Sequence, residues 1–180
     1  MGGHNITNQA PSPWISRFSG LAQGPVLDVA CGAGRHAALF AGRGFQVTAV
    51  DRDLSRLGDL RDHANIAALE TDLETEPAPW RPDPGVWGTV VVANYLWRPL
   101  IPALVSALAP GGVLLYETFA VGNGKYGKPS NSDFLLRPGE LLDAVSGQLQ
   151  VVAYEHGETP SPAVVQRICA VRSEAPVALT

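Results

Sequence analysis

The amino-acid sequence predicts an α/β fold in which helices cover both faces of a doubly wound, mostly parallel sheet of about seven strands. Three observations support this prediction. Short apolar runs alternate with helix-like segments, a glycine-rich turn follows the first such run, and the last two strand-like runs have no helix between them. That closing pair predicts an antiparallel last strand. The chain has 180 residues, 46% of them hydrophobic, so we expect a single domain over residues 1–180.

The first half of the chain contains three predicted strands and two predicted helices. The strands are expected at residues 26–30, 46–50 and 66–70. The first helix covers residues 35–44, where Gly42 and Gly44 close it. The second helix begins at Asp53, a side chain suited to capping a helix N-terminus, and runs to Leu60.

The second half begins with an irregular connection. Four prolines exclude a regular element from residues 75–85. A helix over residues 100–108 precedes the turn Pro110-Gly111-Gly112, and another begins at Pro138 and ends at Gly147. The remaining strands are expected at residues 88–93, 113–118, 149–155 and 164–172.

Composition argues against several classes of protein. A formal net charge of −4 argues against broad binding to nucleic acid. Cys31 and Cys169 lie far apart in the sequence, so no disulfide framework is expected. The histidines lack metal-ligand spacing, and we therefore expect no metal site. They are His4, His36, His63 and His156.

The sequence also predicts a protein without a membrane partner. The longest uncharged stretch, residues 99–116, is interrupted by prolines and glycines, which predict a helix, a turn and a strand. The N-terminal residues lack a basic region followed by an apolar core, so no secretory signal is expected. We therefore expect a cytoplasmic protein, whose oligomeric state the sequence does not indicate.

The strongest functional signal is the turn after the first predicted strand. Residues 28–34 are Asp-Val-Ala-Cys-Gly-Ala-Gly, and Gly32 and Gly34 allow a ligand to approach the backbone. A dinucleotide would place its pyrophosphate here, where the Asp28 carboxylate would repel it. The ammonium and sulfonium groups of S-adenosylmethionine would instead be attracted. Asp28 could also cap its own turn, but further acids at strand ends favour the cofactor role.

Two of these acids suit an adenosine. Asp51 ends the second predicted strand, where a carboxylate can accept hydrogen bonds from both ribose hydroxyls. The following Arg52 could lie against the adenine or receive a 2′-phosphate. Asp72 follows the third predicted strand, which places it to accept from the adenine amino group while the Leu73 backbone N–H reaches a ring nitrogen.

Over about residues 25–172, the sequence resembles class I S-adenosylmethionine-dependent methyltransferases. The resemblance lies in the order and spacing of the glycine turn, Asp51, Asp72 and the Pro110-Gly111-Gly112 turn. Further runs are similar to the small bacterial methyltransferases of the tellurite-resistance type. They are Gly34-Arg35-His36, Tyr116-Glu117-Thr118-Phe119 and residues 134–141. The resemblance implies a Rossmann-like fold and S-adenosylmethionine as cofactor, with S-adenosylhomocysteine as product. The cofactor-binding residues it predicts are Asp28, Ala30, Cys31, Gly32, Gly34, Arg35, Asp51, Arg52, Asp72, Leu73, Asn94 and Tyr95.

The resemblance favours a small-molecule acceptor over a macromolecule. A soft nucleophile, such as a thiol or a chalcogen oxyanion, would need no strong base. An oxygen or nitrogen acceptor would need one, for which His36, Tyr95 and Glu117 are the candidates. His36 could instead position a loop, and Tyr95 could pack over the adenosine. Cys31 is expected to be structural rather than a nucleophile.

Residues 119–136 are predicted to form a substrate lid, and residues 1–24 a further N-terminal segment beside the substrate. The lid and its surroundings contain the candidate substrate-binding residues Arg98, Thr118, Lys125, Tyr126 and Lys128. A local excess of positive charge would attract a small anionic acceptor, although a solvated loop with scattered lysines is the simpler interpretation.

Two other functions remain open. In an NADP-dependent oxidoreductase, residues 32–37 would be a GxGxxA dinucleotide turn and Arg52 would bind the 2′-phosphate. Asp28 and the lack of a recognisable Ser-Tyr-Lys set argue against it. In the other alternative, a methyltransferase-like fold binds the cofactor as a regulatory module.

Overall fold

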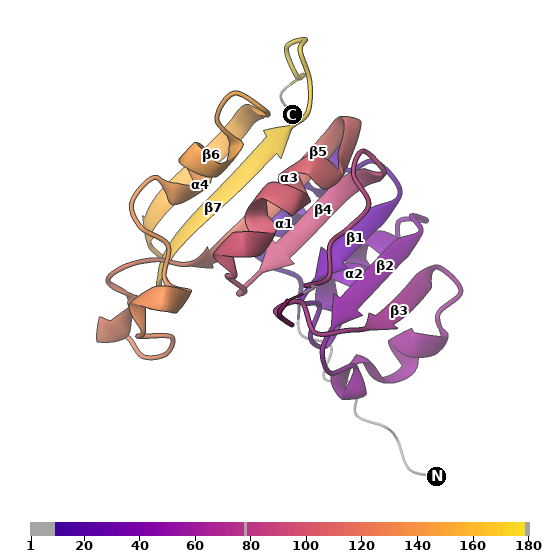
Figure 1. The fold of residues 1–180 in the computed structure, drawn as a ribbon, viewed down its shortest axis with the longest axis horizontal. Coiled ribbons are helices and arrows are strands. Elements are labelled where there is room, and N and C mark those ends of the chain that lie inside the picture. The colour runs from indigo at the N-terminus through magenta and orange to yellow at the C-terminus, as the bar shows by residue number, and fades with distance from the viewer. Residues whose placement is uncertain (1–9, 78, 179–180) are drawn as a thin grey trace.

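The computed structural model describes residues 10–77 and 79–178 and contains a seven-stranded sheet with helices on both faces (Figure 1). The strand order is β3-β2-β1-β4-β5-β7-β6. The strands are β1 (Val26–Val29), β2 (Val47–Asp51), β3 (Ile66–Glu70), β4 (Trp87–Ala93), β5 (Leu108–Phe119), β6 (Gln150–Glu158) and β7 (Val164–Val171). The predicted fold class is confirmed.

The first five strands are parallel and the last pair differs. β1 lies between β2 and β4, and all four of its residues are buried, which explains its continuous apolar character. β7 runs antiparallel to both β5 and β6, as the missing helix between the last two strands predicts. The carboxyl ends of β1 to β4 therefore meet at one edge of the sheet, where α/β proteins bind ligands.

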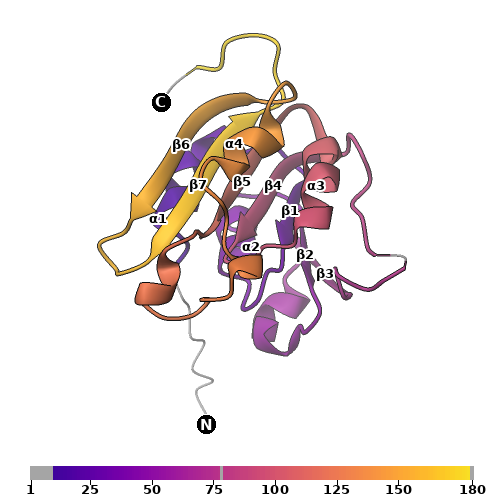
Figure 2. The same ribbon diagram turned by 60° about the vertical axis from the view of Figure 1, so that its left-hand side comes forward.

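Helices cover both faces of the sheet (Figures 1 and 2). The α-helices are α1 (Pro13–Phe18), α2 (Arg35–Ala41), α3 (Ile101–Ala107) and α4 (Glu140–Val145). One buried cluster joins the sheet to α3 and α4 through Leu104 and Leu141, and the other joins it to α1 and α2 through Ile15 and Phe40. Both apolar faces of the central strands are thereby covered.

Some local predictions were wrong. Residues after Asp53 form a 3₁₀ helix, η2 (Ser55–Asp62), rather than an α-helix, because Gly58 has φ 56° and ψ −136° and interrupts it. α1 was not predicted, although Ser12 caps it by accepting from the Trp14 N–H at 3.1 Å. The turn Pro110-Gly111-Gly112 lies within β5, at a shift in its register with β4.

The remaining short helices are one-turn 3₁₀ segments. They are η1 (Ser19–Leu21), η3 (Arg98–Leu100), η4 (Asn123–Lys125) and η5 (Ser132–Phe134). Two of them, η4 and η5, lie in the predicted lid. Among the described residues, no helix is long and apolar enough to cross a membrane.

Candidate functional site

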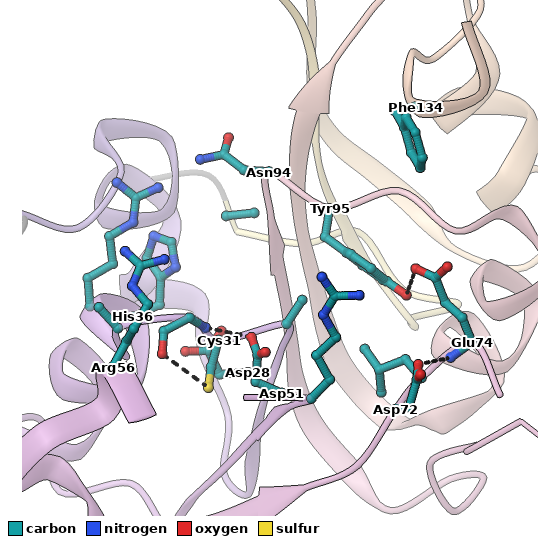
Figure 3. A pocket seen from close by; sticks show the side chains of 17 residues that line it. Asp28, Cys31, His36, Asp51, Arg56, Asp72, Glu74, Asn94, Tyr95 and Phe134 are labelled. Carbon is teal, nitrogen blue, oxygen red and sulfur yellow. Dashed lines mark hydrogen bonds between the residues drawn. The ribbon is translucent and has the colours of Figure 1, made fainter. Parts of the chain in front are cut away.

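A cavity of about 560 Å³ opens at the carboxyl ends of β1 to β4 (Figure 3). Its described lining comes from the last residues of these strands and the segments that follow them, together with Phe134 of η5. The lining residues are Asp28, Ala30, Cys31, Gly32, Ala33, Arg35, His36, Asp51, Arg52, Arg56, Asp72, Leu73, Glu74, Ala93, Asn94, Tyr95 and Phe134. Eleven of the twelve predicted cofactor-binding residues are among them.

The backbone bends sharply where β1 and β4 reach this cavity. Ala30 has φ 53° and Asn94 has φ 57°, and they are the non-glycine residues with positive φ in the described chain. Such conformations cost about 1–3 kcal/mol each and persist where the surrounding structure holds them. Both residues line the cavity, so the strain is concentrated where the chain turns past a ligand.

The two glycines of the turn have different roles. Gly32 has φ 56° and lines the cavity, and its N–H donates to Asp51 Oδ2 at 2.9 Å. Gly34, the predicted cofactor residue outside the cavity lining, has φ 74°, and a Cβ there would lie 2.5 Å from Leu57 Cδ1. Gly34 therefore allows the first turn of α2 to pack closely against η2.

Asp28 is a buried carboxyl at the base of the cavity. Its side chain is 1% exposed, and Oδ2 accepts a hydrogen bond from the Ala37 N–H at 2.8 Å. Burial raises the pKa of Asp28 to about 7, although the Ala37 hydrogen bond and the charge of Arg35 oppose this shift. A cation entering the cavity would favour the ionised form.

Asp51 and Asp72 retain acceptor capacity beyond their internal hydrogen bonds. Asp51 Oδ1 accepts from the Asp53 N–H at 3.1 Å, in addition to the Gly32 contact on Oδ2. Asp72 Oδ1 accepts from the Glu74 N–H at 2.9 Å. Each carboxylate oxygen has two lone pairs, so both groups can still accept hydrogen bonds from a ligand. Three acids around one cavity fit the ammonium, ribose and adenine groups of S-adenosylmethionine.

Two candidate reactive groups are held in unreactive states. The His36 ring is buried, and its Nε2 accepts a hydrogen bond from the Ser12 N–H at 3.2 Å. Burial, with the charge of Arg35, lowers the pKa of His36 to about 4, so the ring is neutral near pH 7. Burial, with the charges of Asp28 and Asp51, raises the pKa of Cys31, which disfavours its thiolate.

Tyr95 stands at the inner rim of the cavity and is hydrogen-bonded on both sides. Its hydroxyl donates to Glu74 Oε1 at 3.1 Å, and its carbonyl accepts from the Tyr116 hydroxyl at 2.9 Å. Burial raises the pKa of Tyr95, and the charge of Glu74 raises it further. The phenol is thus a hydrogen-bond donor, and ionising it to serve as a base is disfavoured.

A second, smaller cavity of about 250 Å³ adjoins the first. The two share four lining residues, and the second extends towards β5 and the predicted lid. Its described lining consists of Glu74, Asn94, Tyr95, Leu96, Thr118, Phe119, Pro129 and Phe134. Figure 3 shows Tyr95 between the loop that carries Cys31 and the side chain of Phe134. Thr118 is the predicted substrate residue that lines this cavity.

The other predicted substrate residues line neither cavity. Arg98 forms a fork with Glu140, with its Nε 2.6 Å from Oε1, and also donates to the Asp133 and Leu135 carbonyls. Lys125 and Tyr126 both bind Glu158, and Lys128 is exposed. The candidate base Glu117 is half-buried on β5 and also lies outside both linings.

Several lining residues were not predicted. Arg56 comes from η2, and Ala33 and Ala93 come from segments whose neighbours were predicted. Glu74 stands two residues after Asp72, and Phe134 lies within the predicted lid, so the sequence carried a weak signal for both.

The predicted N-terminal segment is described from residue 10 onward, and residues 1–9, with His4, lie outside the described residues. Among the described residues, no cluster of three His, Cys, Asp or Glu side chains is arranged to hold a metal ion.

Comparison with known proteins identifies similar sequences and similar structures. Residues 26–112 match the family model of a methyltransferase domain. Trans-aconitate 2-methyltransferase from Paracidovorax citrulli is 36% identical over 111 residues, which cover 57% of this chain and 42% of that protein. The chain thus spans about two fifths of the length of this curated relative.

Solved structures show the same fold at low identity. An S-adenosylmethionine-dependent methyltransferase from Mesorhizobium loti has a TM-score of 0.64 and 15% identity, with 84% of this chain and 92% of that chain covered. TehB from Haemophilus influenzae has a TM-score of 0.61 and 17% identity, with 82% and 57% covered. These matches confirm the fold that the resemblance in the sequence implies. Residues 26–112 of the chain thus match a methyltransferase domain, and the chain has the same fold as solved S-adenosylmethionine-dependent methyltransferases.

Proposed function

We propose that the chain transfers a methyl group from S-adenosylmethionine to a small-molecule acceptor. The observation that supports this most directly is the arrangement of the two adjoining cavities. The larger contains the acids Asp28, Asp51 and Asp72, and the smaller has Tyr95 and Phe134 in its wall. When bound, S-adenosylmethionine supplies an electrophilic methyl group on a positively charged sulfur.

In this proposal each acid holds one part of the cofactor. Asp28 balances the ammonium group, Asp51 accepts from the ribose hydroxyls, and Asp72 accepts from the adenine amino group. The Leu73 N–H serves an adenine ring nitrogen. The strained turns at Ala30 and Asn94 keep backbone groups beside the ligand. Catalysis then rests mainly on proximity and alignment of the acceptor.

The proposed acceptor is a small molecule that is already nucleophilic or loses its proton readily. His36 Nε2 is engaged by Ser12, and the pKa of Tyr95 is raised, so neither supplies a ready base. The relative from Paracidovorax citrulli is named for trans-aconitate, a small molecule, which supports the size of the acceptor. We place the reaction in the cytoplasm, as the sequence led us to expect.

Calorimetry on the purified chain tests the proposal. S-adenosylhomocysteine is expected to bind, and NADPH is not. Asp51→Ala should weaken S-adenosylhomocysteine binding, because each lost charge-assisted hydrogen bond contributes on the order of 1.5–3 kcal/mol. Glu117→Ala, outside both cavity linings, should leave the affinity unchanged. Tight binding of NADPH without S-adenosylhomocysteine would favour the oxidoreductase, and cofactor binding without methylation of any acceptor would favour a regulatory module.

A further inference from the structure

We propose that the smaller cavity binds the methyl acceptor and selects a small aromatic molecule without negative charge, which offers a hydrogen-bond donor to Glu74. In the transfer, the acceptor atom forms a bond to the methyl carbon as the carbon–sulfur bond breaks, S-adenosylhomocysteine leaves, and the proton of the donor group passes to the Glu74 carboxylate. This inference rests on the methyltransferase function proposed above and adds the chemical class of the acceptor. Four features of the smaller cavity support it: its position, its size, its walls and its charge.

The position is suited to an acceptor. The smaller cavity shares Glu74, Asn94, Tyr95 and Phe134 with the larger one, so a molecule in it would lie against a ligand in the other. It is separated from the acids Asp28 and Asp51, which line the larger cavity alone. Contiguity with the cofactor cavity is what a direct transfer requires.

The size restricts the ligand. About 250 Å³ corresponds to roughly eight water molecules at their share of liquid volume, about 30 Å³ each. This is sufficient for a single substituted ring and lies below the range of about 300–1,000 Å³ typical of drug-sized ligands. A small molecule with one ring therefore fits, and a polymer could enter only with an end or a flipped-out group.

The walls are apolar and aromatic. Tyr95, Phe119 and Phe134 contribute rings, and Leu96 and Pro129 contribute further apolar surface. Phe134 is 51% exposed although it borders both cavities. A ring stacked against Phe134 would remove this apolar surface from water, and aromatic side chains prefer such offset or edge contacts.

The charge excludes an anion. Glu74 is the charged side chain among the described residues that line the smaller cavity. Its Oε1 accepts from Tyr95, which leaves lone pairs on both oxygens for a donor on the ligand. An anionic acceptor would lose its hydration beside a carboxylate, and the described lining offers it no basic side chain in exchange.

The described cations near the smaller cavity do not line it, and most of them are engaged elsewhere. Lys128 precedes the lining residue Pro129 but is exposed and lies outside both linings. Arg98 is held by Glu140 and two carbonyl groups, and Lys125 is paired with Glu158. Arg35, Arg52 and Arg56 line the larger cavity and not the smaller one. The undescribed residues 1–9, 78 and 179–180 contain no Lys or Arg in their sequence. The predicted attraction of an anionic acceptor by Lys125 thus gains no support from the cavity.

Binding of matched compounds to the chain saturated with S-adenosylhomocysteine tests the inference. The compounds are tyramine, uncharged 4-methylphenol, 4-hydroxyphenylacetate and trans-aconitate, and the readout is calorimetry. We expect tyramine or 4-methylphenol to bind at least tenfold more tightly than 4-hydroxyphenylacetate, and trans-aconitate to bind more weakly still. The inference is overturned if the anions bind equally well or better, or if neither of the first two compounds binds.

Two variants separate the contribution of charge from that of the aromatic wall. Glu74→Gln should reduce the preference for tyramine over 4-hydroxyphenylacetate at least fivefold. Phe134→Ala should weaken binding of all the ring compounds, whereas Leu142→Ala, an exposed apolar side chain of α4 outside both linings, should change none of them. An unchanged preference in Glu74→Gln would contradict the assigned role of Glu74.

The two proposals can fail separately. If the unmodified chain does not bind S-adenosylhomocysteine, the methyltransferase function itself is contradicted. Intact S-adenosylhomocysteine binding, combined with a preference for anions, would leave that function standing and overturn the acceptor class alone.

Discussion

Asp28 shows how one side chain can weaken the fold and prepare a binding site. The carboxyl lies at the end of β1, and burial raises its pKa to about 7 from an ordinary value of 3.8. Ionisation near neutral pH therefore costs free energy in the folded chain. A bound cation would recover that cost, because it favours the carboxylate.

The first prediction concerns the pH dependence of stability. Between pH 4 and pH 7 the Asp28 carboxyl binds more protons in the folded chain than in the unfolded chain. The contribution of Asp28 to the free energy of unfolding therefore falls as pH rises through this range, and it is constant above pH 7. Asp28→Asn removes this titration. The Tm of Asp28→Asn relative to that of the unmodified chain should therefore rise from pH 4 to pH 8 in thermal melts. A Tm difference that does not change with pH would contradict the raised pKa.

The same carboxyl predicts the pH dependence of cofactor binding. The ammonium group of S-adenosylhomocysteine should favour ionised Asp28, so binding should release a proton below pH 7 and strengthen by up to about tenfold per pH unit. Calorimetry in two buffers of different ionisation enthalpy measures that proton release. Asp28→Asn should bind more weakly and lose most of the proton release. Asp53→Asn, an exposed acid outside the cavity lining, provides the matched control.

A further prediction tests the packing role of Gly34. Alanine at this position would place its Cβ 2.5 Å from Leu57 Cδ1 and hold a non-glycine residue at φ 74°. We expect Gly34→Ala to lower the free energy of unfolding by about 1–3 kcal/mol in urea titrations. Gly20→Ala, where a Cβ would meet no atom within 4 Å, should change it by less than about 0.5 kcal/mol. Equal effects of the two substitutions would remove the steric explanation.

At the scale of elements, Arg98 anchors part of residues 119–136, the segment that the sequence predicts to be a lid. Its guanidinium joins η3 to Glu140 at the start of α4 and to the carbonyls of Asp133 and Leu135, at 2.7 and 2.8 Å. These contacts hold the segment that carries Phe134 beside both cavities. Arg98, which the sequence suggested as a substrate-binding residue, thus contacts this loop and lines neither cavity.

The contacts of Arg98 lead to another prediction. Arg98→Ala should lower the free energy of unfolding by about 1–3 kcal/mol, because it removes the forked contact from the half-buried Glu140 carboxylate, which keeps only its contacts with Arg137, and leaves two carbonyls without their donor. Protease sensitivity should rise first around residues 128–136. Arg98→Lys should restore the charge but not the forked contact, and so rescue the loop only in part. Lys125→Ala is the control: it breaks an exposed ion pair with Glu158 and should leave the Tm unchanged within error. If Lys125→Ala destabilised the chain as much as Arg98→Ala, an anchoring role specific to Arg98 would be contradicted.

At the scale of the whole molecule, the strand order predicts where the backbone is best protected. β1 is paired on both sides and buried on both faces, whereas β3 pairs with β2 alone and β6 with β7 alone. Amide hydrogen exchange should therefore be slowest in β1 and β4 and fastest in the outward-facing amides of β3 and β6. Equal protection of the amides of β1 and β3 would contradict the expected order of exchange rates. Self-association of the chain through the β3 edge would also protect these amides, and sedimentation would reveal it.

Much of the architecture could be predicted, because parallel strands bring their carboxyl ends to one edge of a sheet. Asp28, Asp51 and Asp72 follow three such strands, so their proximity follows from the strand pattern. The path of a loop does not follow in the same way. The pairing of Lys125 with Glu158 joins residues 33 positions apart, and the packing of Gly34 against Leu57 depends on how η2 folds back. The interruption of η2 at Gly58 likewise depends on a backbone conformation that helix signals do not encode.

The boundary between the cavities suggests how this chain could acquire a new acceptor. With the exception of Phe134, the residues that line the larger cavity come from positions 28–95, which the methyltransferase family model covers. Thr118, Phe119, Pro129 and Phe134 of the smaller cavity all lie beyond the end of that match at residue 112. A graft of residues 118–134 from a relative is therefore expected to change the proposed acceptor preference and to leave most of the proposed cofactor-binding residues unchanged.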